Sequence, residues 1–306
     1  MTRLSAARMS VAVNLTLAVS KAAVGLASGS IAILAEAAHT SVDLLASLLT
    51  YVTVRQSQRP ADETHPFGHG KFENLSAIAQ AAMILGVSVM VLWHAGHKIV
   101  SGAPLSLDRS YVMALIVMGA SAAIQVFAGR RLEEVAAAER SQALEADALH
   151  FSAEVVTSVG VFVGLGAIGV GRLLGHHWDV LDPIAAMVVA GYILFPATGL
   201  LRSAFHQITD VSLPESERKV IEEELGRPRD GVRGYHLLRS RRAGSARLVD
   251  MHVLVSAEMR VDQAHAICDA LEEAIAARLP GADVTIHVEP DDGTHERNAR
   301  LSIGSG

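Results

Sequence analysis

The sequence is poor in several residue types on which enzymes and binding domains depend. It contains one cysteine, Cys268, which excludes a disulfide framework and any cysteine-rich metal module. Aromatic residues make up 4% of the chain, which argues against a function built on aromatic stacking. Charged residues make up 19%, below the roughly 25% of a soluble domain, which argues against a soluble enzyme. The net charge of −6 argues against a nucleic-acid-binding protein. Histidine, by contrast, is abundant, with 14 residues.

The few charges are distributed unevenly along the chain. Between residues 75 and 127 the charged residues are Lys98, Asp108 and Arg109. Between residues 215 and 300 charged residues are dense, and no apolar run approaches the length of a membrane span. We therefore expect a membrane domain at 1–207 and a cytoplasmic domain at 208–306.

A helix needs about 20 mostly apolar residues to cross a bilayer. Six segments approach this requirement: Met9–Leu26, Ile31–Val54, Leu75–Val100, Tyr111–Arg130, Leu144–Leu174 and Val180–Phe205. The N-terminal segment lacks a small-residue cleavage site, so it is interpreted as a retained span. Lysine and arginine are more frequent in the loops on the side of the N-terminus, which predicts that both termini are cytoplasmic. Lys21, late in the first span, is expected to extend outward to the interface.

The C-terminal part has the patterns of a compact α/β domain. Helical spacing covers 212–225 and 261–279, and strand patterns cover 231–242, 245–256 and 282–290. The predicted order is α-β-β-α-β. Three strands need both helices on one face of the sheet to form a core.

Two pairs of a histidine and a carboxylate stand out within the apolar spans. His39 and Asp43 are four residues apart, and so are His150 and Glu154. Residues at this spacing lie on one face of a helix. Together the pairs offer two nitrogens and two oxygens, a tetrahedral set for a zinc-like ion. Each ionisable group in a membrane costs about 2.5–3.5 kcal/mol on insertion scales, so the repeated pattern favours a functional site. The alternative is that each pair only braces the bundle.

These motifs and the six spans resemble the cation diffusion facilitators, and among them the bacterial zinc-type metal/proton antiporters. The resemblance covers about Ala12 to Pro290 and includes the stretches GSIAILAEAAHTSVDLLASL, PADETHPFGHGKFENLSA, LHFSAEVVTSVGVFVG and WDVLDPIAA. It implies a six-helix transmembrane domain, a metallochaperone-like cytoplasmic domain and a homodimer in the cell inner membrane.

The resemblance implies that the transport site consists of His39, Asp43, His150 and Glu154. Two of these depart from the common bacterial pattern, in which aspartate often stands at position 39 and usually at position 154. Glu154 is one methylene longer than aspartate, which bears on metal preference rather than on metal binding.

A cytoplasmic loop carries Asp62, His65 and His69, with the spacing of a metal site seen in the resembled family. Without the resemblance, such loop histidines are usually solvated. The same family pairs a lysine at the position of Lys71 with an acid of the other subunit, for which Asp210 is the candidate.

The resemblance also implies that the tail binds two ions where two tails meet. The residues it implicates are His236, His252, His265, His287 and Glu289. The alternative is that they are scattered surface histidines. Cys268 is interpreted as a small core residue.

The function implied is efflux of Zn²⁺ in exchange for protons by alternating access, with no nucleic-acid partner and no covalent catalysis. Fe²⁺, Mn²⁺, Cd²⁺, Co²⁺ or Ni²⁺ as the main substrate is left open, since imidazole ligands suit several of these ions. A membrane-anchored metal sensor is a further alternative. An intramembrane metalloenzyme fits less well, because a catalytic zinc site keeps one position free of protein ligands.

Overall fold

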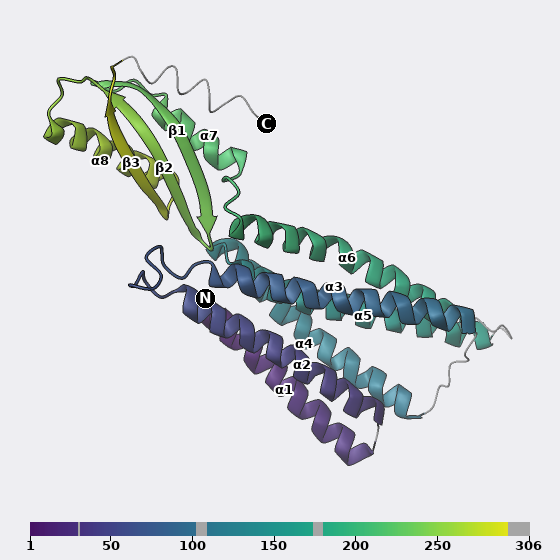
Figure 1. Cartoon of the computed structure of the whole chain (residues 1–306). Helices are drawn as coiled ribbons and strands as arrows, with labels where there is room; N and C mark the ends of the chain where they lie inside the picture. Colours follow the sequence, from purple (N-terminus) through teal and green to yellow (C-terminus); the bar gives the residue numbers. More distant parts are fainter. Residues whose placement is uncertain (30, 102–108, 174–179, 293–306) are drawn as a thin grey trace. The chain divides into compact units, whose positions relative to one another are not determined.

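In the computed structural model the chain divides into two compact units, residues 1–205 and 206–306. The structure describes residues 1–29, 31–101, 109–173 and 180–292. Six long helices form the first unit (Figure 1): α1 (Arg3–Ser28), α2 (Ile31–Ser57), α3 (Phe72–Ser101), α4 (Arg109–Glu139), α5 (Gln142–Leu173) and α6 (Leu181–Ile208). The predicted end of the fifth span at Leu174 lies outside the described residues.

Several helices are longer than the apolar runs that predict them. Helix α4 continues to Glu139, nine residues beyond the predicted end at Arg130. In this extension Leu132 and Val135 are buried in a core cluster with Ala6 and Ala7 of α1. An apolar run marks only the part of a helix that faces lipid, whereas an amphipathic continuation extends the helix beyond it.

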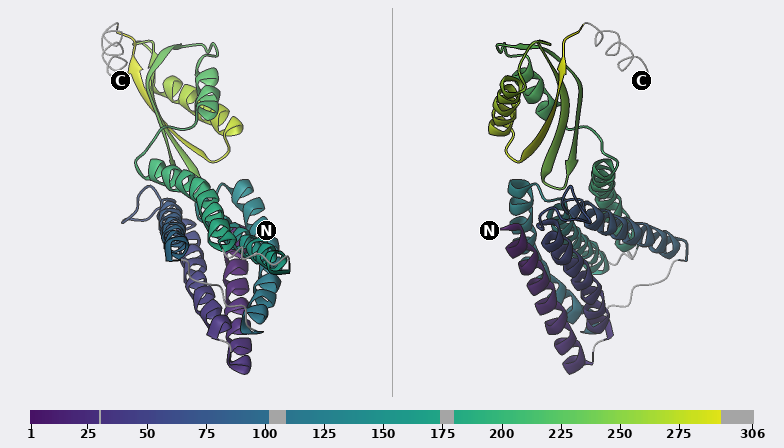
Figure 2. Two further views of the ribbon diagram at one scale, coloured as in Figure 1. Left: turned by 90° about the vertical axis from the view of Figure 1, so that its right-hand side faces the viewer. Right: turned by 60° about the vertical axis from the view of Figure 1, so that its left-hand side comes forward.

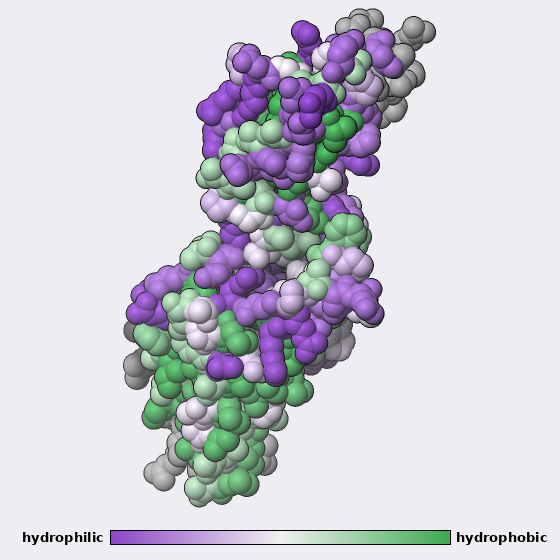
Figure 3. Space-filling model, turned by 90° about the vertical axis from the view of Figure 1, so that its left-hand side faces the viewer, coloured by the Kyte–Doolittle hydropathy of each residue, from purple (hydrophilic) through white to green (hydrophobic). Residues whose placement is uncertain are grey.

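Within the described residues, four helices have a stretch long and apolar enough to cross a membrane, namely α1, α3, α5 and α6. Helices α2 and α4 pack against them in the same unit. Figure 3 shows mostly hydrophobic side chains over much of the visible face of the helical unit. Large apolar residues of this unit, such as Val19, Leu45 and Phe195, are exposed. Such a surface is expected of a bundle surrounded by lipid, and the predicted membrane fold is confirmed.

Polar side chains join the helices near the start of α3. The buried Glu73 accepts hydrogen bonds from Arg3 of α1 at 3.1 Å, from Ser57 of α2 at 2.7 Å, and from Ser141 before α5. Because a buried carboxylate is stable only when it is paired, this network fixes four segments relative to one another.

The second unit contains α7 (Glu215–Leu225), β1 (Val232–Ala243), β2 (Ala246–Val255), α8 (Val261–Arg278) and β3 (Ala282–Pro290). The sheet order is β1-β2-β3, with β1 antiparallel and β3 parallel to β2. Both helices lie on one face of the sheet (Figure 2). The predicted α-β-β-α-β order is confirmed. The strands could be predicted because their apolar residues alternate, which gives the sheet one core face.

The core of this unit lies between the helices and that face. Val249, Met251 and Val253 of β2 are buried against Leu271 and Ile275 of α8. The buried Cys268 of α8 lies on the inner side of the same helix. The alternate residues of the strands therefore point to the open face, which bears the histidines described below.

Candidate metal centres

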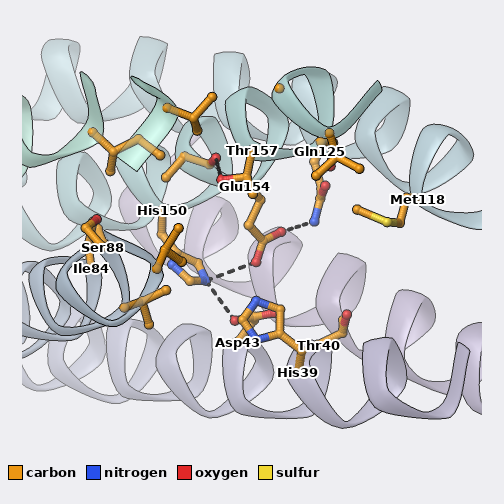
Figure 4. Close-up of a pocket in the computed structure, with 18 of the residues that line it drawn as sticks. His39, Thr40, Asp43, Ile84, Ser88, Met118, Gln125, His150, Glu154 and Thr157 are labelled. Carbon is orange, nitrogen blue, oxygen red and sulfur yellow. Dashed lines mark hydrogen bonds and ion pairs between the residues drawn. The ribbon is translucent and has the colours of Figure 1, made fainter. Parts of the chain in front are cut away.

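Four side chains from α2 and α5 converge in the helical unit (Figure 4). Ligand atoms of His39, Asp43 and Glu154 all lie within 4.8 Å of one another. The Nε2 atom of His150 lies 3.2 Å from Asp43 Oδ1 and 3.3 Å from Glu154 Oε1. Helical spacing puts each pair on one face of its helix, and packing of α2 against α5 brings the two faces together.

These atoms are poorly satisfied by the protein itself. Asp43 is 2% exposed. Asp43 Oδ2, His150 Nε2 and Glu154 Oε1 are buried and form no hydrogen bond. Buried polar atoms normally have partners, and a cation bound among these would provide one for all three. Two carboxylates with two neutral imidazoles also balance the charge of a divalent ion, so the residues fit a divalent transition metal as substrate.

Helix α4 contributes a residue that the sequence motifs did not reveal. Gln125 is 3% exposed and donates a hydrogen bond from Nε2 to Glu154 Oε2. This leaves Glu154 Oε1 directed toward His150 (Figure 4). The sequence did contain a sign of this residue, because Gln125 is the one amide side chain in the apolar segment between residues 111 and 130.

The pocket around the ligands also reaches Lys21, Glu36 and Thr40. Lys21 is 5% exposed, and its Nζ lies 3.4 Å from Glu36 Oε2 and 2.8 Å from Thr40 Oγ1. The expectation that Lys21 extends to the interface was therefore wrong. A nearby carboxylate and hydroxyl satisfy the ammonium inside the bundle, which removes the reason for it to reach outward.

The loop between α2 and α3 brings together Asp62, His65 and His69. His69 Nε2 lies 3.4 Å from Asp62 Oδ2, and the two imidazole rings are 4.3 Å apart. Gly68 has a φ of 78°, a conformation that glycine adopts without strain. Hydrogen bonds from the Thr64 hydroxyl and from the backbone amides of His65 and Thr64 lower the pKa of Asp62 to about 2. The carboxylate is thus ionised and available as a ligand.

The candidate partner of Lys71 has a contact within its own chain. Asp210 Oδ1 accepts a hydrogen bond at 3.0 Å from Arg241 Nη1 on β1. An interlock between Lys71 and Asp210 across a dimer would compete with this ion pair, and it stays a prediction.

A third cluster lies on the open face of the sheet in the second unit. His236 and His252 are direct neighbours on β1 and β2, and Glu289 is on β3. Glu289 bridges them, with Oε2 2.9 Å from His236 Nε2 and Oε1 2.8 Å from His252 Nδ1. Their side chains are only 12–22% exposed. Two imidazoles and a carboxylate are the ligand types of a zinc site.

The two other histidines predicted in the tail differ in position. His287 pairs in register with His252 and lies 3.5 Å from Glu289 Oε1, at the edge of the cluster. The side chain of His265 on α8 is 76% exposed, and its Nδ1 lies 3.8 Å from Asp269 Oδ1. Within the described part of a single chain, His265 joins none of the three clusters.

Two family models match the two units of the chain. Residues 7–209 match the model of the cation efflux transmembrane domain, and residues 213–291 match that of the cation efflux protein cytoplasmic domain. The chain belongs to the cation efflux family, the cation diffusion facilitators. As a family member, the protein is a membrane-spanning efflux transporter of divalent cations. The predicted family is confirmed.

Curated relatives match most of the chain, and solved structures match about a quarter of it. The cation-efflux pump FieF of Klebsiella pneumoniae subsp. pneumoniae is 35% identical over 265 residues, covering 86% of this chain and 84% of that protein. FieF of Salmonella newport is 33% identical over 264 residues, with the same coverage. Among solved structures, a chain of CzrB is 37% identical, covering 26% of this chain and 99% of that chain, with a TM-score of 0.24. A MamM-CTD variant is 32% identical, covering 26% and 98%, with a TM-score of 0.24.

Proposed function

We propose that this cation diffusion facilitator exports Zn²⁺ from the cytoplasm in exchange for protons. The transport site comprises His39, Asp43, His150 and Glu154, and it opens alternately to the two sides of the cell inner membrane. Both termini are cytoplasmic in this proposal, with the transport domain at 1–207 and the regulatory and dimerisation domain at 208–306. The observation that carries it is the convergence of four ligand side chains, three of which retain a buried atom that forms no hydrogen bond.

The ligand chemistry supports both the substrate and the exchange. The set has two nitrogens and two oxygens with no thiolate, which suits Zn²⁺ and disfavours Cu⁺. Mg²⁺ is disfavoured because it prefers an octahedron of oxygens and dehydrates reluctantly. Histidine and carboxylate ligands must release protons before a metal binds. Metal entry and proton binding at one site therefore compete, which is the condition for antiport.

Regulation is assigned to the tail. We place one metal at His236, His252, His287 and Glu289 on the open face of the sheet. Exposed His265 of a second copy would complete a shared site in a C₂ dimer, where one surface patch meets its own copy. Asp62, His65 and His69 are proposed as a separate loop site.

The test is flux in proteoliposomes under an imposed pH gradient, with zinc and internal pH recorded together. We expect zinc to move in one direction and protons in the other. Asp43→Ala should abolish both movements. The control His94→Ala, which alters an exposed histidine of α3, should retain both. Movement of iron, manganese or cobalt without zinc would change the substrate and keep the mechanism. Metal movement without proton movement would refute antiport, and no metal movement at all would favour the sensor.

A further inference from the structure

A buried polar cluster lies beside the metal ligands and outside the pocket that contains them. It consists of Ser10 and Asn14 of α1, Ser47 of α2 and Asp147 of α5, and we call it the Ser47 cluster. All four residues are 0% exposed, and none of them lines the pocket around the metal ligands. The sequence favours either solvation or a polar contact for Asp147, and the structure shows a polar contact with Ser47.

The hydrogen bonds of the Ser47 cluster can be followed one by one. Ser10 donates to Ser47 Oγ at 2.7 Å, and Asn14 Nδ2 donates to the same oxygen at 2.8 Å. Ser47 donates its one proton to Asp147 Oδ1 at a long 3.4 Å. Two buried atoms are left without a hydrogen bond, Asn14 Oδ1 and Asp147 Oδ2, and both are oxygens. The cluster therefore lacks a donor.

Asp147 has no close cationic partner among the described residues. The side chains that reach it from α1 and α2 belong to the uncharged Ser47 cluster. The other helices packed against α5 are α3, α4 and α6. In the described part of the chain, no lysine, arginine or histidine of any helix lies within the 4.0 Å of an ion pair with Asp147. The ionisable neighbour on its own helix is His150, one turn away.

A buried ionised carboxylate without a cation costs several kcal/mol. The neutral form avoids this cost, and its O–H supplies a donor to a cluster with unpaired oxygens. We propose that Asp147 binds a proton in this conformation and forms a proton site distinct from the metal ligands. The evidence is the complete burial, the single long hydrogen bond and the lack of an ion pair.

The position of this proton site couples it to the metal site. Asp147 precedes His150 by three residues on α5, and Ser47 follows Asp43 by four on α2, so one helical turn separates the two sites on both helices. A divalent ion at the metal site favours ionised Asp147 through its charge. Metal entry therefore expels the proton, and protonation of Asp147 favours metal release. This coupling step rests on the proposed function.

Infrared difference spectroscopy of the full-length protein in lipid tests the proton site directly. Zinc addition to the wild type should remove the C=O band of a protonated carboxyl. Asp147→Asn should lack this band change, and Asp147→Glu should show it at a shifted frequency. Glu145→Gln alters an exposed carboxyl two residues away and should show the same band change as the wild type. The same band change in Asp147→Asn as in the wild type would overturn the proposal, and so would a metal-free wild type without such a band.

Proton counting distinguishes this proposal from the proposed function. We expect Asp147→Asn to release about one proton fewer per zinc bound than the wild type, with zinc still bound. Unchanged release in this variant would refute the role of Asp147 in coupling and leave zinc/proton antiport intact. If the wild type moved zinc without protons, antiport would fail, while the infrared band would still decide whether Asp147 binds a proton.

Discussion

At the scale of single residues, the proposed transport site is marked by buried ligand atoms that form no hydrogen bond. Asp43, His150 and Glu154 each retain a buried atom with no hydrogen bond. A site prepared for a cation must tolerate this deficit, because neighbours that satisfied every ligand would compete with the metal. Gln125 is consistent with this requirement, because it donates a hydrogen bond to one oxygen of Glu154 and leaves the other oxygen available to the ion.

Replacement of Gln125 by leucine should weaken metal binding. The change removes the donor that orients Glu154, and loss of such an orienting hydrogen bond typically costs 10–100-fold in metal affinity. Isothermal titration of zinc into full-length protein that lacks the tail ligands measures this affinity. Ser121→Ala is the matched control, because Ser121 lines the same pocket one turn earlier on α4 and donates to the Val117 carbonyl. Equal affinities of the two variants would show that Gln125 does not position Glu154.

The loop carboxylate should resist acid. Hydrogen bonds from Thr64 and His65 hold the pKa of Asp62 at about 2, below its ordinary value of 3.8. Because the folded pKa is the lower one, the stabilisation is complete above about pH 4 and is lost as the pH falls through 2. Thr64→Val should raise the pKa of Asp62 toward 3.8, as followed by the NMR shift of the Asp62 carboxyl carbon. No change in this variant would mean that the hydroxyl contributes nothing.

At the scale of elements, close helix packing holds the ligands in place. A Cβ atom added to Gly160 of α5 would collide with Cγ2 of Val189 on α6. Elsewhere Ala146 of α5 packs with Ala77 of α3 and Ala204 of α6. Small residues let membrane helices approach closely where lipid provides no hydrophobic drive for association. Because α5 carries His150 and Glu154, this packing also positions half of the ligand set.

Gly160→Ala should therefore impair both stability and transport. Overpacking of this kind costs about 1–3 kcal/mol, and relief by movement of α5 would displace Glu154, six residues earlier. Gly191→Ala on α6 is the control, since a Cβ there meets nothing within 4 Å. Thermal unfolding in detergent and zinc flux measure the two effects. Addition of Val189→Ala to Gly160→Ala should restore stability and transport. A Gly160→Ala protein as stable and active as the control would contradict the packing argument.

At the scale of the whole molecule, the chain combines a lipid-facing bundle with a tail that has its own hydrophobic core. Candidate metal ligands occur in both units. In the first unit they come from two helices and from the loop between α2 and α3, whereas in the tail they come from three neighbouring strands. This separation allows metal binding in the tail to be removed without any change in the transport site.

Replacement of His236, His252 and Glu289 by alanine should lower the zinc content of the full-length protein by at least one ion per protomer. Transport at saturating zinc should persist, because His39, Asp43, His150 and Glu154 are untouched. Metal analysis after dialysis and proteoliposome flux measure the two quantities. His94→Ala serves as control for the loss of an exposed histidine. An unchanged zinc content would exclude a tail site at these residues.

The amount that could be predicted from sequence differs between the features of this protein. Apolar run length predicts membrane helices because the thickness of the bilayer is fixed, and alternating apolar residues predict the strands of the tail. The four-residue spacing predicts that His39 faces the same way as Asp43, since helix periodicity is a local property. Helix ends could not be predicted from apolar runs, as the extension of α4 shows.

The sequence by itself determined the class of protein, the two ligand pairs and the order of elements in the tail, because each depends on residues close together in the chain. Only the tertiary structure decided that Gln125 contacts Glu154, that Lys21 pairs inward with Glu36, and that Asp147 is buried without an ion pair. These contacts depend on how each helix is rotated about its axis and on which helix lies beside it. Packing of side chains from distant parts of the chain sets both.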